Sequence, residues 1–180
     1  VKITRKRAIE YYNRYFEVYK GVAQYIKDQR QKAERDGHVE NLFGFRREIY
    51  QNDESRSTYW GNQAVNSPVQ GTAHHLLLIA IARTWRKQKT YSLLQKPVME
   101  IHDALYWYTR LRDLAMAYQQ GKHLLEAGTV ESVSKRFEIQ LKVPLIAEGS
   151  AGFCLGSMTD YHGEPIEEFL PAWRKKHKES

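Results

Sequence analysis

Residues 98–108 read Val-Met-Glu-Ile-His-Asp-Ala-Leu-Tyr-Trp-Tyr. Two short apolar and aromatic runs, residues 98–101 and 105–108, flank the link His102-Asp103-Ala104. β-Branched and aromatic residues on both sides of a short link are typical of two antiparallel strands. We therefore predict a β-hairpin whose tight turn carries His102 and Asp103.

The carboxylate of Asp103 has two explanations. The end of a strand holds a side chain rigidly, which suits a ligand of a divalent metal ion. Aspartate is also a favoured turn residue, and this ordinary structural role is the commoner case. From these residues alone, a metal ligand and a plain turn residue both stay open.

A polar stripe precedes the hairpin. Four residues follow one another at intervals of four positions: Asn62, Asn66, Gln70 and His74. An uninterrupted helix would place them on one face. Asparagine and glutamine both donate and accept hydrogen bonds, which suits the acceptors and the guanine amino group of a DNA minor groove. An ordinary solvated helix face would show the same spacing. Because neighbours on a helix face different ways, we expect no metal shared by His74 and His75.

Helical periodicity extends from Thr58 to about Lys89, with Ser67-Pro68 inside it. Proline in the interior of a helix costs about 3 kcal/mol, but it is tolerated in a first turn. We therefore expect either a kink at this point or a second helix that begins at Pro68.

The rest of the chain alternates between helical and extended patterns, so the predicted fold class is α+β. Gly21 is expected at the junction of two N-terminal helices, with Thr4 as the first cap. Gly128 and Thr129 are expected as a helix stop and a helix cap. The expected elements are two helices over 4–35, a hairpin over 38–50 turning near Gly44, helices over 111–119 and 130–139, a strand over 144–148, a loop over 149–156, and a short helix with a basic tail over 161–180.

The chain of 180 residues is basic, since 28 lysines and arginines against 21 acidic residues give a formal net charge of +7. Together with 12 tyrosines and 4 tryptophans, this charge favours nucleic acid as a partner. Phosphates attract cations, and bases stack on aromatic rings. A slightly basic protein with an aromatic core is the alternative.

The single cysteine, Cys154, excludes an internal disulfide framework and a cysteine-built zinc site. The longest apolar run, near residues 76–82, is far shorter than the roughly 20 residues that cross a bilayer. We therefore expect a protein of a reducing, intracellular setting, with no membrane partner.

Two segments resemble motifs of the family A DNA polymerases, the DNA polymerase I type. Asn66-Ser-Pro-Val-Gln70-Gly-Thr-Ala73 is similar to that family's Asn-x-Pro-x-Gln-Gly-(Thr/Ser)-Ala segment. Val98-Met-Glu-Ile-His102-Asp103 is similar to its third polymerase motif, an apolar strand that ends in His-Asp. Three further segments resemble parts of the same family, so the resemblance extends over about residues 1–158. Residues 5–22 resemble the helix after the nucleotide-binding helix of the fingers, and residues 37–47 resemble a Gly-x-Val-x-Thr-x-x-Gly-Arg-Arg segment. Residues 143–148 resemble the closing strand.

By this resemblance the chain is the C-terminal palm and fingers portion of such a polymerase, expected to be phage-like, the product of a split gene, or a truncated fragment. The implied location is the bacterial cytoplasm or a phage-infected host. The resemblance implies fingers-derived helices and a basic hairpin over residues 1–57. It implies a palm portion over residues 58–158, in which helices pack beside the third-motif hairpin. The basic C-terminal tail, 159–180, has no counterpart in the family.

The resemblance also implies roles for individual residues. Asp103 would be one of the two carboxylates that hold a pair of catalytic Mg²⁺ ions, with the second carboxylate outside this chain. His102 would be the other catalytic residue, at the primer terminus. The implied DNA contacts are Asn66 and Gln70 at the minor groove, Asn62 one turn earlier, and Arg46 and Arg47 on a basic surface.

The implied function is that of a DNA-directed DNA polymerase, a nucleotidyltransferase of DNA replication and repair, with primer–template DNA and dNTP as partners. Activity would need an N-terminal portion that carries the first carboxylate motif and the nucleotide-binding helix. Two residues depart from the family pattern: Ala104 stands where the family usually has glutamate, and Asn62 where it commonly has arginine. Ala104 and the diverged C-terminal tail leave open a non-catalytic relic that binds duplex DNA. A basic α+β domain of unrelated function is a third, separate alternative.

Overall fold

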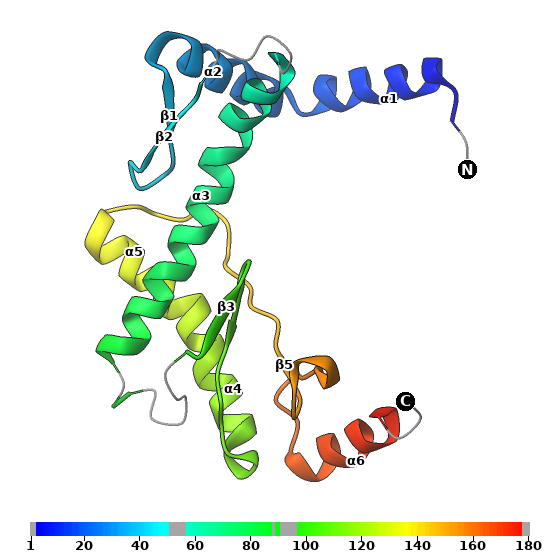
Figure 1. Cartoon of the computed structure of the whole chain (residues 1–180), viewed down its shortest axis with the longest axis vertical. Helices are drawn as coiled ribbons and strands as arrows, with labels where there is room; N and C mark the ends of the chain where they lie inside the picture. The colour runs from blue at the N-terminus through cyan, green and yellow to red at the C-terminus, as the bar shows by residue number, and fades with distance from the viewer. Residues whose placement is uncertain (1–2, 51–56, 88, 91–96, 178–180) are drawn as a thin grey trace. The chain divides into compact units, whose positions relative to one another are not determined.

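A computed structural model describes residues 3–50, 57–87, 89–90 and 97–177 of the chain (Figure 1). In these residues helices alternate with three two-stranded antiparallel sheets, which confirms the predicted α+β class. The chain forms two compact units, Val1–Thr72 and Ala73–Ser180. These two units are the parts of the chain within which most residue contacts fall. The predicted division by polymerase part, 1–57, 58–158 and 159–180, is a different one and stays a prediction.

Two helices open the first unit, as predicted: α1 (Arg5–Val18) and α2 (Lys20–Asp36). Thr4 caps α1, because its hydroxyl oxygen accepts a hydrogen bond of 3.4 Å from a backbone N–H of the first turn. The junction lies at Tyr19 rather than at Gly21. The backbone of Tyr19 leaves the helical region, with φ −103° and ψ 60°, whereas Gly21 continues α2.

A hairpin follows α2 and confirms the one predicted over 38–50. Its strands are β1 (His38–Glu40) and β2 (Arg46–Glu48). Two glycines in the left-handed region set its limits: Gly37, with φ +71°, ends α2, and Gly44, with φ +76°, turns the hairpin. Asn41 organises the turn, since its Oδ1 accepts two backbone N–H groups of the turn at 3.0 Å.

The long helix α3 (Ser57–Arg86) is continuous, so the expected second helix that begins at Pro68 is wrong, whereas a kink at Ser67-Pro68 stays a prediction. Gly61, Ala64 and Pro68 are all buried and recur at helical spacing, so the proline belongs to the packed face. The core that this face helps to cover consists of Ala33, Val39, Ile49 and Ala64, with Trp60 packed against it. Burial of the packed face offsets the hydrogen bond that proline cannot donate.

In the second unit, β3 (Met99–Ile101) and β4 (Ala104–Tyr106) form the predicted hairpin. Met99 pairs with Tyr106, and Ile101 pairs with Ala104, so only His102-Asp103 remain to join the strands. The strand residues point to both sides of this small sheet in alternation.

A helical segment follows the hairpin. Its parts are the 3₁₀ turn η2 (Leu111–Asp113), α4 (Leu114–His123), the π-helical turn η3 (Leu124–Gly128) and α5 (Thr129–Phe137). The predicted stop at Gly128 and cap at Thr129 are therefore wrong. Thr129 Oγ1 does not cap, because it donates to the carbonyl of Leu124 at 2.9 Å. Leu124 and Val133 are both fully buried, so packing keeps the backbone helical through the glycine.

Residues 144–148 do not form the predicted strand. Side chains of the preceding helical segment satisfy their backbone instead. The N–H of Ala147 donates to Glu126 Oε1 at 2.9 Å, and its carbonyl accepts from Lys122 Nζ at 3.1 Å. The backbone hydrogen bond lowers the pKa of Glu126. A strand begins within the predicted loop instead: β5 (Ser150–Ala151) pairs antiparallel with β6 (Thr159–Asp160). The 3₁₀ turn η4 (Leu155–Ser157) lies between the two strands.

The last helix, α6 (Ile166–His177), confirms the short C-terminal helix that was predicted. It closes an aromatic core in which Tyr161 is 1% and Phe169 is 4% exposed. Tyr118 of α4 packs against the same core. A Cβ atom added at Gly149 would lie only 2.3 Å from the ring of Tyr118, so the backbone there passes directly over the ring.

An ion-pair network joins the end of α3 to α5 within the second unit. Arg83 Nη2 lies 2.7 Å from Glu131 Oε2, and Arg83 Nη1 donates to Ser132 Oγ at 2.8 Å. Lys135 Nζ contacts the other oxygen of Glu131 at 2.8 Å. The hydrogen bonds from Lys135 and Arg83 lower the pKa of Glu131 from 4.5 to about 2.

This lowered pKa predicts acid-sensitive stability. Glu131 favours the folded state above its unfolded pKa of 4.5, and that contribution is lost as the pH falls towards about 2. In Glu131→Gln, the free energy of unfolding should therefore lose this part of its dependence on pH. Urea unfolding followed by circular dichroism at several pH values measures the difference, with Glu167→Gln on the exposed face of α6 as the control. Equal pH dependence between pH 2 and 5 in the two variants would contradict the assignment.

Candidate functional site

The loop of the β3–β4 hairpin presents both residues of the predicted catalytic pair to solvent. His102 and Asp103 are exposed, and they are the whole connection between the strands. His102 has φ +55°, the positive value that two-residue hairpin loops need at their first position. A non-glycine residue at such a backbone angle costs about 1–3 kcal/mol. Residues with this kind of strain cluster at functional sites. The loop therefore holds Asp103 in a defined position at the end of a strand.

The side chains at this loop supply part of what a Mg²⁺ site needs. A carboxylate oxygen is the ligand that Mg²⁺ prefers, and proteins often supply only one or two carboxylates to it. Asp103 fits one such position. Among the described residues, no group of three histidine, cysteine, aspartate or glutamate side chains is arranged to hold a metal ion. The described part of the chain thus offers one ligand of such a site rather than a complete one.

The polar stripe lies on one uninterrupted helix. Asn62, Asn66 and Gln70 are exposed on α3 at intervals of four residues, so they share a face within the first unit. None of the three side chains hydrogen-bonds to another residue that the structure describes. Their donors and acceptors are therefore open to an external partner.

The two arginines of the β1–β2 hairpin differ in their surroundings. Arg46 Nε donates to Glu40 Oε1 at 2.8 Å, and Glu40 also accepts from Lys32 Nζ at 2.7 Å. These two hydrogen bonds lower the pKa of Glu40. Arg47 is exposed and has no ion-pair partner within the described ranges. Arg47 therefore offers the freer positive charge, a distinction that spacing in the sequence could not reveal.

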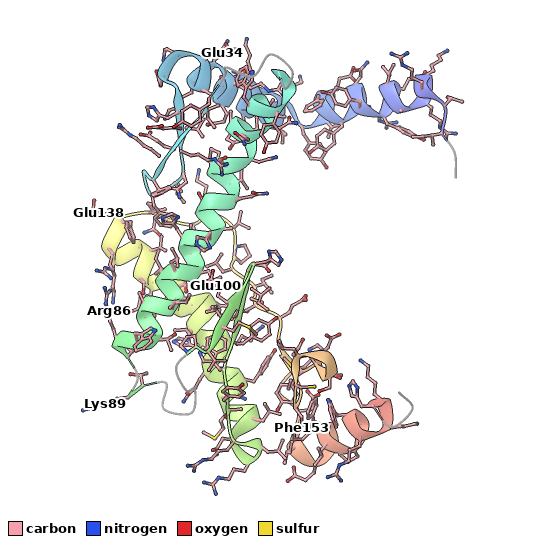
Figure 2. All side chains as sticks on the ribbon, in the orientation of Figure 1. Glu34, Arg86, Lys89, Glu100, Glu138 and Phe153 are labelled. Atoms are coloured by element: carbon pink, nitrogen blue, oxygen red, sulfur yellow. The ribbon has the colours of Figure 1, made fainter. Side chains whose placement is uncertain are left out.

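One contact beside the hairpin was absent from the sequence-based prediction. His74 Nδ1 lies 3.3 Å from Glu100 Oε1. This contact joins α3 to β3 inside the second unit, and Glu100 is labelled in Figure 2. The rings of His74 and His75 are 6.3 Å apart and meet edge to face. The acidic partner of His74 is 26 residues away in the chain, so no local pattern signals the pair.

Comparison with known proteins gives a consistent result. A family model described as DNA polymerase family A matches residues 1–156. The DNA polymerase I of Caldicellulosiruptor bescii is 31% identical over 157 residues, and that of Pseudomonas aeruginosa is 30% identical over 155 residues. Each alignment covers 84% of this chain, but only 17% and 16% of the respective relative.

The similarity extends to a solved structure. The POL domain of Pol1 from M. smegmatis, in complex with DNA primer-template and dNTP, matches with a TM-score of 0.64 and 22% identity. The match covers 79% of this chain and 24% of that one, and it establishes a likeness of fold. The chain thus spans about a sixth of the length of the curated relatives. Within its described residues, no helix is both long and apolar enough for a membrane span.

Proposed function

The chain belongs to DNA polymerase family A, and from that premise we propose that it is the segment of a DNA-directed DNA polymerase that carries one catalytic carboxylate and part of the DNA-binding surface. The observation that supports this function best is the exposed His102-Asp103 loop, held at a strained backbone angle at the end of the β3–β4 hairpin. The proposal also includes an N-terminal portion outside this chain, because the chain covers only 17% of the length of its relative from Caldicellulosiruptor bescii. Polymerization would also need residues from an N-terminal portion that carries a second carboxylate and the nucleotide-binding helix.

In the proposed reaction, the 3′-hydroxyl of the primer gives its proton to solvent, its oxygen forms a bond to the α-phosphorus of a dNTP, and the bond from that phosphorus to pyrophosphate breaks. Asp103 would hold one ligand position of a Mg²⁺ pair, and the bound ions would stabilise the attacking and leaving oxygens. His102, the neighbouring loop residue, would contact and orient the primer terminus. Both side chains are exposed, which supports direct contact with these groups.

We place the primer–template duplex along the exposed face of α3 in this proposal. Asn66 and Gln70 can each donate and accept, so they suit the minor groove, where every base pair offers acceptors. Asn62 extends the same face by one turn, and Arg46 and Arg47 would add phosphate contacts on β2. The absence of internal hydrogen bonds from the three amide side chains, within the described residues, supports this use.

A primer-extension assay tests the proposed function. The chain, joined to or mixed with the upstream portion of its polymerase, should add nucleotides in a template-directed and Mg²⁺-dependent manner. Binding of primer–template by the assembled protein, without any incorporation under conditions in which a related polymerase is active, would contradict the proposal.

The relic hypothesis has one observation in its favour. Ala104 begins β4 with a methyl group, at the position where the family usually has a carboxylate. A relic would bind duplex DNA through α3 and β2 but would never extend a primer, even with the upstream portion present. The primer-extension assay separates the two functions.

Arg47 provides a prediction for the shared DNA-binding step. Because Arg47 has no ion-pair partner among the described residues, Arg47→Ala should weaken binding of primer–template and lower the slope of log affinity against log salt by about 1. Arg46→Ala should have a smaller effect, since Glu40 already pairs with that guanidinium. Fluorescence anisotropy across a salt series measures both, with the exposed Arg136→Ala as the control. An unchanged slope in Arg47→Ala would remove this residue from the DNA surface.

A further inference from the structure

Among the residues that the structure describes, the β3–β4 hairpin has a single polar side-chain connection to the rest of its unit. That connection is the contact between His74 Nδ1 and Glu100 Oε1, 3.3 Å apart. No other side chain of residues 97–108 forms a hydrogen bond or ion pair with a residue that the structure describes. Glu100 is also the only carboxylate in the two strands.

The two strands of this hairpin are held differently. All three residues of β4 are half-buried, whereas Glu100 and Ile101 of β3 are exposed. Apolar burial is non-directional, so it keeps β4 in place without fixing the angle of the hairpin. A hairpin of two short strands is also marginally stable by itself. The strand β3 is held by its backbone pairing with β4, and among the described residues the contact with His74 adds a side-chain restraint from α3.

The strand β3 leads directly into the loop that carries Asp103. Only two residues, Ile101 and His102, separate Glu100 from this carboxylate. His74 lies on the part of α3 that belongs to the same compact unit, and that part continues as regular helix to Arg86. A contact between a long helix and the strand next to the loop is well placed to set the position of the loop.

We propose that His74 and Glu100 are positioning residues, which hold the Asp103 loop at a fixed place and angle relative to α3. This inference rests on the proposed polymerase function, in which Asp103 is a catalytic residue. Neither His74 nor Glu100 touches the reacting groups in this arrangement. They act through the geometry of the hairpin.

Because the pair is exposed, its effect on the reaction rate can be distinguished from an effect on the stability of the fold. The side chains of His74 and Glu100 are 51% and 30% exposed, and ion pairs of this kind contribute little to global stability. Loss of the pair should therefore leave the urea unfolding midpoint nearly unchanged. A displacement of a catalytic group by about 1 Å, in contrast, can lower a rate by about 100-fold.

The first experiment measures steady-state primer extension by the polymerase that contains this chain. Glu100→Ala and His74→Ala should each lower kcat by about twofold to fivefold, with little change in the KM for dNTP, because an exposed ion pair can change the population of the correctly placed loop by no more than about this factor. The double variant should be no worse than either single variant, because both remove one contact. The exchanged pair, His74→Glu with Glu100→His, should recover most of the original rate. Glu100→Gln should retain most of it, because its amide oxygen is still an acceptor for the imidazole. Glu167→Ala on α6 is the control for loss of an exposed carboxylate.

A second measurement does not depend on catalysis. Hydrogen exchange of the backbone amides of residues 99–106 in the full chain should be faster in Glu100→Ala and should return towards the original rate in the exchanged pair. Additive kinetic effects of the two single variants, or unaltered exchange in Glu100→Ala, would overturn the positioning role. Failure of the unmodified polymerase to extend a primer would instead count against the proposed function.

Discussion

Asp103→Ala is expected to abolish primer extension by the assembled polymerase. An aspartate that holds a catalytic ion supports several kcal/mol of transition-state stabilisation. Each 1.36 kcal/mol corresponds to a factor of ten in rate, so a loss of about 4 kcal/mol lowers kcat roughly 1,000-fold. Because Asp103 is exposed in a loop, the substitution should leave the unfolding midpoint of the chain almost unchanged. Single-turnover incorporation of one nucleotide measures the rate.

The matched control for this variant is Asp160→Ala. Asp160 is also exposed, and it lies at the end of another two-stranded sheet of the same unit, β5–β6. Its removal should leave incorporation within about twofold of the original rate, since surface substitutions are usually close to neutral. If Asp103→Ala retained a tenth or more of the original activity, Asp103 would not be a catalytic ligand, and the loop would be an ordinary turn.

Tyr161→Ala is expected to produce the largest loss of stability. Tyr161 is 1% exposed, and its ring lies 5.0 Å from that of Phe169 and 5.3 Å from that of Tyr118, measured between centroids. Truncation of a buried aromatic residue to alanine costs about 3–5 kcal/mol. Urea unfolding of the full chain, followed by circular dichroism, measures the change in the free energy of unfolding.

Two further tyrosine variants separate the contributions to this effect. Tyr161→Phe removes only the hydroxyl, which donates to the carbonyl of Glu164 at 2.6 Å, and it should cost about 1 kcal/mol. Tyr108→Ala removes a ring that is 68% exposed and should cost less than about 0.5 kcal/mol. A cost for Tyr161→Ala as small as that for Tyr108→Ala would mean that α6 and β6 do not close a core.

Local sequence signals predicted the parts of the fold that depend on neighbouring residues. Gly44 turns the β1–β2 hairpin because a positive φ is most easily reached by glycine, and that requirement is visible in the sequence. The tight His102-Asp103 turn was predicted from its two flanking apolar runs. Thr4 was recognised as a cap for the same kind of reason, since its partner lies three residues away.

The errors arose where distant packing outweighs a local preference. Pro68 does not interrupt α3, because it is buried in line with Gly61 and Ala64. Gly128 does not end its helix, since Gly128 itself and Leu124 of the same turn are buried. Residues 144–148 read as a strand, but side chains from Lys122 and Glu126 satisfy their backbone. None of these partners can be recognised from a short window of sequence.

The candidate site divides in the same way. The motif containing Asp103 was recognisable from order and spacing, and so was the stripe on α3. The pairing of Arg46 with Glu40 and of His74 with Glu100 needed the fold, because each depends on which faces two elements turn towards each other. The sequence shows which residues carry a charge, but only the fold shows whether that charge is paired with another group of the molecule.

The aromatic core around Tyr161 has a practical consequence for chimeric enzymes. The family match ends at residue 156, whereas Tyr161, Phe169 and Trp173 of this core come after it. A segment cut at the family boundary and grafted into another polymerase would leave Tyr118 and Ala151 uncovered, and contiguous exposed apolar surface promotes aggregation. A transplantable version of this segment should therefore extend through α6, so that the graft carries its own closing helix.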